Sequence, residues 1–149
     1  MSDNWLKFIP TAPNYRPPLP AAETAKALLA SFVPDADEVV FTFSDTVEFV
    51  HNGGNWEGVK CPACGADAEP WWTDAMNTAN KTRFSKLEVT AACCGASVSL
   101  NELDYPWPVG FAKFVLEAMN PNCNDLTAEQ IRQISDCLGC EVRRIWVHI

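Results

Sequence analysis

The chain has 149 residues, which is close to the usual size of one domain and leaves room for a hydrophobic core and one small insertion. Hydrophobic residues make up 48% and charged residues 20%, a balance typical of globular proteins, which excludes a largely disordered chain. The formal net charge is -8, whereas proteins that bind nucleic acids usually carry an excess of Lys and Arg. The charge therefore argues against DNA or RNA as a partner.

Cysteine content and hydropathy bear on the compartment. The N-terminal residues show no basic start followed by a long apolar run, and no apolar stretch is long enough to span a membrane. The seven cysteines are odd in number and include C-x-x-C pairs, a pattern more typical of metal binding than of a disulfide framework. We therefore expect a soluble cytoplasmic protein without a membrane partner.

The N-terminal segment begins with a short apolar piece at residues 5–9, which predicts a strand. Five prolines in residues 10–20 exclude a regular element there and favour a stiff, extended connector. Apolar residues then recur at helical spacing over 21–32, and Pro34 follows. The sequence therefore predicts a strand, a connector and a helix in that order.

Alternating apolar residues next predict strands at 38–43 and 47–50, separated by a turn or bulge at 44–45. Within the cysteine-containing region that follows, residues 70–81 predict a short helix that begins with Pro70, and residues 87–90 predict a strand.

Residues 111–118 fit two patterns. Phe114, Leu116 and Ala118 alternate as in a strand, but Phe111, Phe114, Val115 and Ala118 also fit one stripe of a helix. We favour the strand.

The last helix has the clearest boundary in the chain. Thr127 and Gln130 form a capping box, Leu126 and Ile131 suit a hydrophobic staple, and Gly139 lies where a left-handed residue ends a helix. Residues 142–149 alternate as a terminal strand, with Ile145, Val147 and Ile149 on one face.

These elements predict an α+β fold. Outside the cysteine-containing region the order is strand, helix, strand, strand, helix, strand, which is typical of a ferredoxin-like split βαβ arrangement with both helices on one face of an antiparallel sheet. We expect a single domain over 1–149, with a zinc-binding insertion at about 57–104.

Two cysteine pairs predict a metal site. Lys60-Cys61-Pro62-Ala63-Cys64-Gly65 resembles the knuckle of a zinc ribbon, in which a tight turn directs two thiolates at one ion. The second pair, Cys93 and Cys94, departs from that pattern, because the first cysteine of a second knuckle would fall at Ala91. Successive side chains tend to point apart, so both can bind only if the backbone kinks.

If only Cys94 of the second pair binds, His51, Asp67 or Asp74 are the alternative fourth ligands. With four thiolates the zinc would be saturated, which predicts one structural ion and not a catalytic one, since catalytic zinc keeps a position open for water.

No motif for a nucleophile or a phosphate-binding loop occurs, and His51 and His148 lie outside any catalytic pattern, so we expect no enzymatic activity. The pair Cys137 and Cys140 has thioredoxin-like spacing but lies at a helix C-terminus, where the dipole disfavours a thiolate. We interpret both as packing residues. A second metal site that includes Cys123 is the alternative.

Two further clusters suggest partners. The aromatic residues Tyr105 and Trp107 alternate with two prolines, and they either seal the joint between the insertion and the sheet or bind a partner. The basic residues Lys81, Arg83 and Lys86 suggest nucleic-acid binding, but such charges more often stay solvated at a helix end.

The layout as a whole resembles a group of small uncharacterised bacterial proteins. The resemblance rests on the Cys-Pro-x-Cys-Gly knuckle, the Cys93-Cys94-Gly95 pair, the stretch 100–111 and the closing Leu138-Gly139-Cys140. It implies no activity. We expect a non-enzymatic, zinc-stabilised module that binds a protein partner or forms a homodimer; a nucleic-acid-binding zinc ribbon is the alternative.

Overall fold

Helices and strands alternate along the chain, which the computed structural model describes over residues 2–149. In chain order the elements are β1 (Asn4–Pro10), α1 (Leu19–Phe32), β2 (Glu38–Val50), α2 (Glu69–Asn80), β3 (Glu88–Thr90), β4 (Ser97–Ser99), the 3-10 turn η1 (Leu100–Glu102), β5 (Gly110–Met119), α3 (Ala128–Leu138) and β6 (Val142–His148). The protein is therefore α+β, as its sequence predicts. Within residues 2–149, no helix is both long and apolar enough to cross a membrane.

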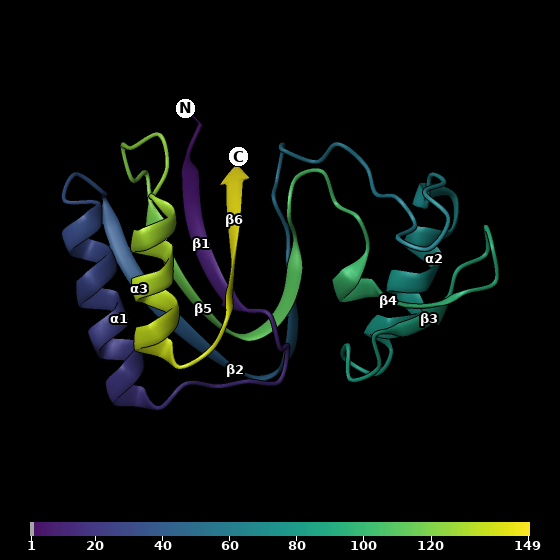
Figure 1. Ribbon diagram of the computed structural model, residues 1–149, viewed down its shortest axis with the longest axis horizontal. Coiled ribbons are helices and arrows are strands. Elements are labelled where there is room, and N and C mark those ends of the chain that lie inside the picture. The colour runs from purple at the N-terminus through teal and green to yellow at the C-terminus, as the bar shows by residue number, and fades with distance from the viewer. Residues whose placement is uncertain (1) are drawn as a thin grey trace.

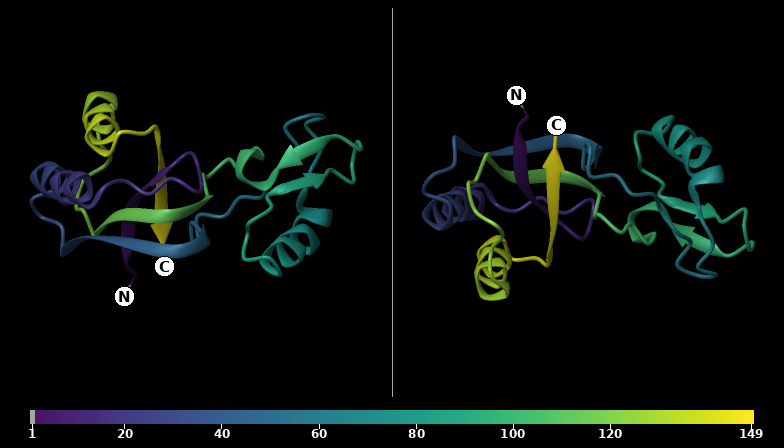
Figure 2. Two further views of the ribbon diagram at one scale, coloured as in Figure 1. Left: turned by 90° about the horizontal axis from the view of Figure 1, so that it is seen from below. Right: turned by 90° about the horizontal axis from the view of Figure 1, so that it is seen from above.

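The strands form two sheets. Four of them make an antiparallel sheet in the order β2-β5-β1-β6, and β3 pairs with β4 in a separate two-stranded sheet. The helices α1 and α3 lie side by side at one end of the molecule, and the segment with α2, β3 and β4 lies at the other (Figure 1). Both views in Figure 2 show the four-stranded sheet between these two parts.

One face of the four-stranded sheet is covered by α1 and α3. The fully buried residues that meet there are Leu6 and Phe8 of β1, Ala22, Ala25 and Leu29 of α1, Phe114, Leu116 and Ala118 of β5, and Ile134 of α3. The alanines of α1 let this helix lie close to the strands. The strand predicted at 111–118 is confirmed, and its three alternating residues form the centre of this core.

The helix α3 begins as predicted. The Thr127 hydroxyl accepts a hydrogen bond from the Gln130 amide at 3.1 Å, and the Gln130 side chain accepts one from the Thr127 amide at 2.9 Å. Gly139 ends the helix with a φ of 76°, in the left-handed region. The capping box and the C-terminal glycine are therefore both confirmed.

Replacing Thr127 with alanine should lower the free energy of unfolding by about 1 kcal/mol, because the Gln130 amide at the start of α3 loses its hydroxyl acceptor. Urea unfolding followed by circular dichroism measures this change. The matched control is Thr73→Ala at an exposed position inside α2, where alanine is the better helix former. Equal destabilisation by the two substitutions would contradict the capping role.

The strand β2 is continuous where two strands were predicted. Phe43 pairs with Phe114, and the next pair joins Glu48 to Ala112, so residues 44–47 lie opposite Lys113 alone. The bulge expected near 44–45 is thus present and longer than expected. Because it adds an odd number of residues, the side chains after it change faces. Phe43 packs toward the helices, whereas Phe49 packs toward the cysteine-containing segment.

Beyond the bulge, the C-terminal end of β2 and the N-terminal end of β5 bend over the second face of the sheet. There Val50 and Ala112 pack against Ile9, Ile145 and Val147 in a small core of their own. At this bend β5 needs a glycine, because a Cβ atom on Gly110 would lie 2.5 Å from the Ile9 side chain.

The outer edge of β6 is paired at its C-terminal end. Gly53 forms a parallel bridge with His148, and the Gly54 amide donates to the His148 carbonyl at 2.7 Å. The segment that leaves β2 thereby returns to the opposite edge of the same sheet.

Two sequence expectations need correction. Helix α1 begins at Leu19, inside the predicted connector, because prolines fit the first turn of a helix. Ile149 does not join Ile145 and Val147 in the core: β6 ends at His148, and the Ile149 side chain beyond it is 63% exposed.

Candidate metal centre

Two turns of matching geometry carry the cysteines. In the first, the Cys61 amide donates to the Ala66 carbonyl and the Gly65 amide donates to the Cys61 carbonyl, both at 2.8 Å. In the second, the Ala91 amide donates to the Ala96 carbonyl at 2.8 Å, and the Gly95 amide donates to the Ala91 carbonyl at 2.7 Å. The glycines have φ of 75° and 77°, which a side chain would strain.

The matching turns show how the second pair departs from a regular knuckle. Ala91 takes the place that Cys61 has in the first turn, and both are buried. Cys94 corresponds to Cys64. Cys93, which directly precedes Cys94, supplies the thiol that Ala91 lacks. The turn therefore brings the sulfurs of two successive cysteines into one group.

The four sulfurs form a tight group. All lie within 4.8 Å of one another, with Cys61 Sγ 3.8 Å from Cys94 Sγ and Cys64 Sγ 3.5 Å from Cys93 Sγ. A disulfide would require about 2.0 Å. A tetrahedral zinc ion with bonds of about 2.3 Å to sulfur places the sulfurs about 3.8 Å apart. The spacing therefore fits a metal and not a covalent bond.

Electrostatics point the same way. The backbone amide of Cys64, which hydrogen-bonds to the Cys61 sulfur, lowers the pKa of Cys61 to about 7. Desolvation, together with hydrogen bonds from the neighbouring thiols, raises the pKa of Cys93 to about 12. The Cys61 thiol therefore ionises readily, whereas the Cys93 thiol resists ionisation, mainly because it is shielded from water and to a lesser extent because of the neighbouring thiols. A cation at the centre is what allows all four to be thiolates together.

Trp71 lies beside this group. Its buried Nε1 has no partner of ordinary hydrogen-bond geometry among residues 2–149, yet it is near enough to the Cys93 sulfur to lower the pKa of that thiol. A buried N–H that hydrogen-bonds to a metal-binding thiolate is a supporting contact of the kind that tunes metal sites. From sequence Trp71 is only an apolar residue of a short helix, and no spacing distinguishes this role.

An aromatic core holds the two turns. The rings of Trp56 and Trp72 are 4.8 Å apart between centroids, and Trp72 Nε1 donates to the Tyr105 hydroxyl at 3.1 Å. That hydroxyl donates in turn to the Leu100 carbonyl at 2.7 Å. The same core includes Phe111, so it continues into the start of β5.

Tyr105 and Trp107 therefore differ in their surroundings. Tyr105 is buried in the joint between the cysteine-containing segment and the sheet, which is the sealing position, and burial raises the pKa of its hydroxyl to about 12. Trp107 is 38% exposed, so of the two rings it is the one presented at the surface.

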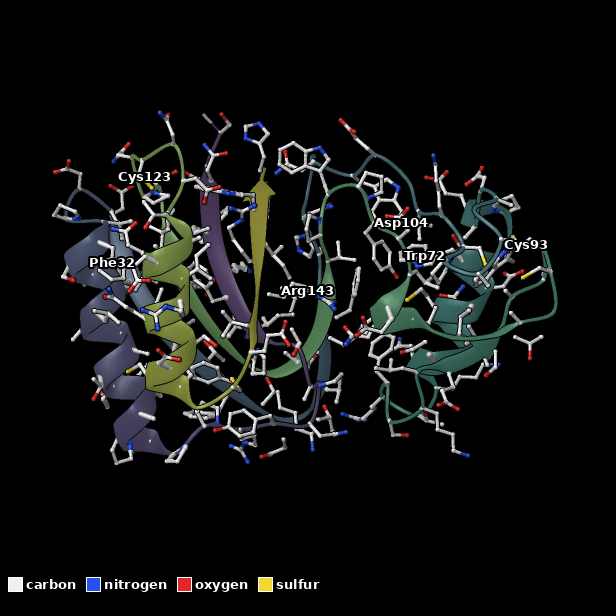
Figure 3. The ribbon with its side chains drawn as sticks, in the orientation of Figure 1. Phe32, Trp72, Cys93, Asp104, Cys123 and Arg143 are labelled. Carbon is white, nitrogen blue, oxygen red and sulfur yellow. The ribbon has the colours of Figure 1, made fainter. Side chains whose placement is uncertain are left out.

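Arg143 is the main polar link across that joint, a role that the sequence did not indicate. Its Nη1 donates to the carbonyls of Asn101 at 2.9 Å and Val109 at 3.0 Å, and to the Asn101 side chain at 3.0 Å. Figure 3 shows Arg143 on the side of the sheet that faces the segment carrying Cys93. A second link is the backbone pairing of Lys60 with Asp104, where the chain enters and leaves this segment.

The alternative fourth ligands lie outside the sulfur group. His51 Nδ1 accepts a hydrogen bond from the Gly53 amide at 3.0 Å, and Asp67 Oδ1 accepts one from the Glu69 amide at 3.0 Å at the start of α2. Among residues 2–149 the only cluster of metal-binding type is that of the four cysteines, so Asp74 and His148 are outside it as well.

The remaining cysteines pack against the helical core. Burial raises the pKa of Cys123, Cys137 and Cys140, and the Cys137 thiol donates to the Ala21 carbonyl at 3.8 Å. These surroundings suit packing residues. The basic residues of the turn after α2 are all exposed; they are Lys81, Arg83 and Lys86.

No protein-family model matches the chain, and no curated protein or solved structure is significantly similar to it. The interpretation of its function therefore rests on the geometry described above.

Proposed function

We propose that the chain is a non-enzymatic protein-interaction module whose cysteine-containing segment is stabilised by one structural zinc ion. The observation that supports a bound metal is the group of four sulfurs, whose spacing suits tetrahedral coordination of one ion. Thiolate ligands favour zinc over magnesium or calcium, and four protein ligands leave no position for a substrate. Zinc in this site stabilises the cysteine-containing segment.

The fold supports the same interpretation. The order β2-β5-β1-β6, with every neighbouring pair antiparallel and both helices on one face, is the arrangement expected of a ferredoxin-like sheet. The two turns and the β3–β4 pair have the form of a zinc-ribbon insertion between the second and third strands of that sheet. Cys93 lies at the end of the molecule opposite to α1 and α3 (Figure 3), so a metal bound there would be a local staple.

The interaction role rests on the exposed surface. Trp107, Leu19 and Ile149 are the large hydrophobic side chains that residues 2–149 leave exposed, and the chain is acidic. An exposed tryptophan is a frequent anchor in protein interfaces. The partner is a protein or a second copy of the chain.

The metal is tested by elemental analysis of purified protein and by exchange with Co²⁺. We expect about one zinc per chain, and a Co²⁺ form with the intense visible bands of a tetrahedral thiolate site. Purification without stoichiometric metal, together with failure to bind Co²⁺, would contradict the proposal.

The interaction is tested by sedimentation of the zinc-loaded protein and by pull-down, each repeated with Trp107→Ala. A dimer or specific partner that this substitution abolishes supports the module. A salt-sensitive complex with nucleic acid, lost on neutralising Lys81, Arg83 and Lys86, would instead establish the alternative function.

Replacing Trp71 with phenylalanine should weaken zinc binding about tenfold, because the Cys93 thiolate loses its indole N–H while the apolar ring is kept. Competition with a chromophoric chelator measures the affinity. Trp56→Phe is the matched control, since its indole N–H donates to Glu69 Oε1 and not to a thiol. If both variants bind zinc as the parent does, Trp71 has no supporting role.

A further inference from the structure

A cavity of about 420 Å³ lies at the end of the sheet where β1 begins and β5 and β6 end. It is in the size range of small-molecule sites, and none of the four clustered cysteines lines it. The loop after β5, which carries Cys123, forms one wall (Figure 3). Residues from five separate parts of the chain meet there, among them five asparagines: Asn4, Asn55, Asn120, Asn122 and Asn124.

Carboxamides predominate among the polar side chains that line this cavity. The described residues of the lining include no Asp, Glu, Lys or Arg, although charged residues make up 20% of the chain. A carboxamide offers both donors and an acceptor without a charge. The wall is therefore polar and, apart from His148, uncharged.

Part of the wall is fixed by the framework. Asn120 has a φ of 47°, its Oδ1 accepts from the Asn4 amide at 2.9 Å, and its Nδ2 donates to Asp3 at 3.0 Å and Asp37 at 2.9 Å. Asn122, with a φ of 54°, donates from Nδ2 to the Asp35 carbonyl at 2.8 Å. Both residues with left-handed backbone, Asn120 and Asn122, are thus held by side-chain hydrogen bonds. These bonds order the loop before any ligand binds.

Other polar atoms retain free capacity. Asn4 Oδ1 lies 2.7 Å from His148 Nδ1, and because an amide oxygen only accepts, Nδ1 is the donor of this bond and Nε2 makes no hydrogen bond among residues 2–149. Asn55 uses Nδ2 on the Trp146 carbonyl at 3.1 Å, which leaves its Oδ1. Within the described chain, the Asn124 side chain makes no hydrogen bond. Donors and acceptors are therefore both available.

Two indoles complete the lining. Trp146 of β6 is half-buried and Trp107 is 38% exposed. An indole offers a flat apolar face beside the polar wall.

We propose that this cavity binds an uncharged carbohydrate. A pyranose ring has apolar C–H groups that pack on an indole, and hydroxyls that both donate and accept, as carboxamides do. The carboxylates of Asp3 and Asp37, which accept hydrogen bonds from Asn120, make the surroundings negative, which disfavours phosphorylated sugars, nucleotides and nucleic acid. The site does not depend on the proposed zinc function.

The test is titration of zinc-loaded, ¹⁵N-labelled protein with glucose, galactose, N-acetylglucosamine and maltose, and with adenosine as the flat neutral competitor. At least one sugar should give saturable shifts of indole and asparagine side-chain signals, with Kd of about 1 mM. Trp107→Ala and Asn124→Ala should each weaken binding about tenfold or more, a loss of roughly 1.4 kcal/mol.

Asn77→Ala, at an exposed position in α2, is the matched control and should bind as the parent does. Asn124 is exposed and makes no hydrogen bond within the described chain, so Asn124→Ala should fold like the parent. This variant therefore tests the proposal even if Trp107→Ala fails to fold. The proposal is overturned if no sugar shifts these signals, if Asn124→Ala leaves sugar binding unchanged, or if adenosine binds more tightly than every sugar.

Discussion

Stripping the zinc with a chelator should unfold the cysteine-containing segment while the four-stranded sheet and its two helices stay folded. Zinc binding contributes on the order of 10 kcal/mol in small thiolate-held units, far more than a core as small as the one around Trp56 and Trp72 can supply. The near-ultraviolet circular dichroism of these rings should be lost, and the far-ultraviolet signal of α1 and α3 should remain.

A single substitution provides the matched experiment. Cys61→Ser removes the buried ligand and should reproduce the chelated state even when zinc is present. Cys137→Ser alters a cysteine outside the sulfur group and should keep both the metal and the tryptophan signal. Retention of the tryptophan signal after complete zinc removal would show that the segment folds without the ion.

Replacing Arg143 with methionine should lower the free energy of unfolding by about 3 kcal/mol, the second largest effect we expect. The methionine retains an apolar stem, but the carbonyls of Asn101 and Val109, both in buried residues, lose a charged donor. Because these bonds join η1 to β6, thermal unfolding should also separate into two transitions, one for each part. Differential scanning calorimetry at full zinc occupancy measures both quantities.

The control for this change is Arg132→Met on α3. Arg132 pairs with Glu129 and Asp136, but its side chain is 62% exposed, and such pairs contribute about 0.5 kcal/mol or less. Similar losses from the two substitutions would mean that Arg143 acts only as a surface charge.

Local signals in the sequence predict much of the fold. The limits of α3 follow from Thr127, Gln130 and Gly139, which act within a few residues of themselves. The alternation of Phe114, Leu116 and Ala118 identifies β5, because a strand buried against helices requires it. Cys61 and Cys64 reveal one half of the sulfur group for the same reason: their turn is complete within six residues, 61–66.

What the sequence does not reveal depends on contacts between distant segments. The length of the bulge in β2 is set by its pairing with Lys113, and so is the change of face that directs Phe49 away from the helices. Arg143 looks like an ordinary strand residue until η1 is placed beside it. The position of Cys93 depends on the turn that begins at Ala91.

The cavity illustrates the same limit. Its asparagines are separated by up to 120 residues along the chain, since Asn4 and Asn124 both line it. Asparagines in loops are usually turn formers, and Asn120 and Asn122 have that role as well. Only the meeting of the sheet ends distinguishes these residues from ordinary loop residues.

The bridge between Gly53 and His148 also affects how this protein meets other chains. An exposed sheet edge is a template on which another chain can add a strand, in recognition or in aggregation. Here the segment from Asn52 to Gly54 occupies part of the β6 edge, and the bulge at 44–47 interrupts the row of amides and carbonyls along β2 at the other edge. Both margins of the sheet are thereby blunted, which favours partners that bind through side chains over partners that extend the sheet.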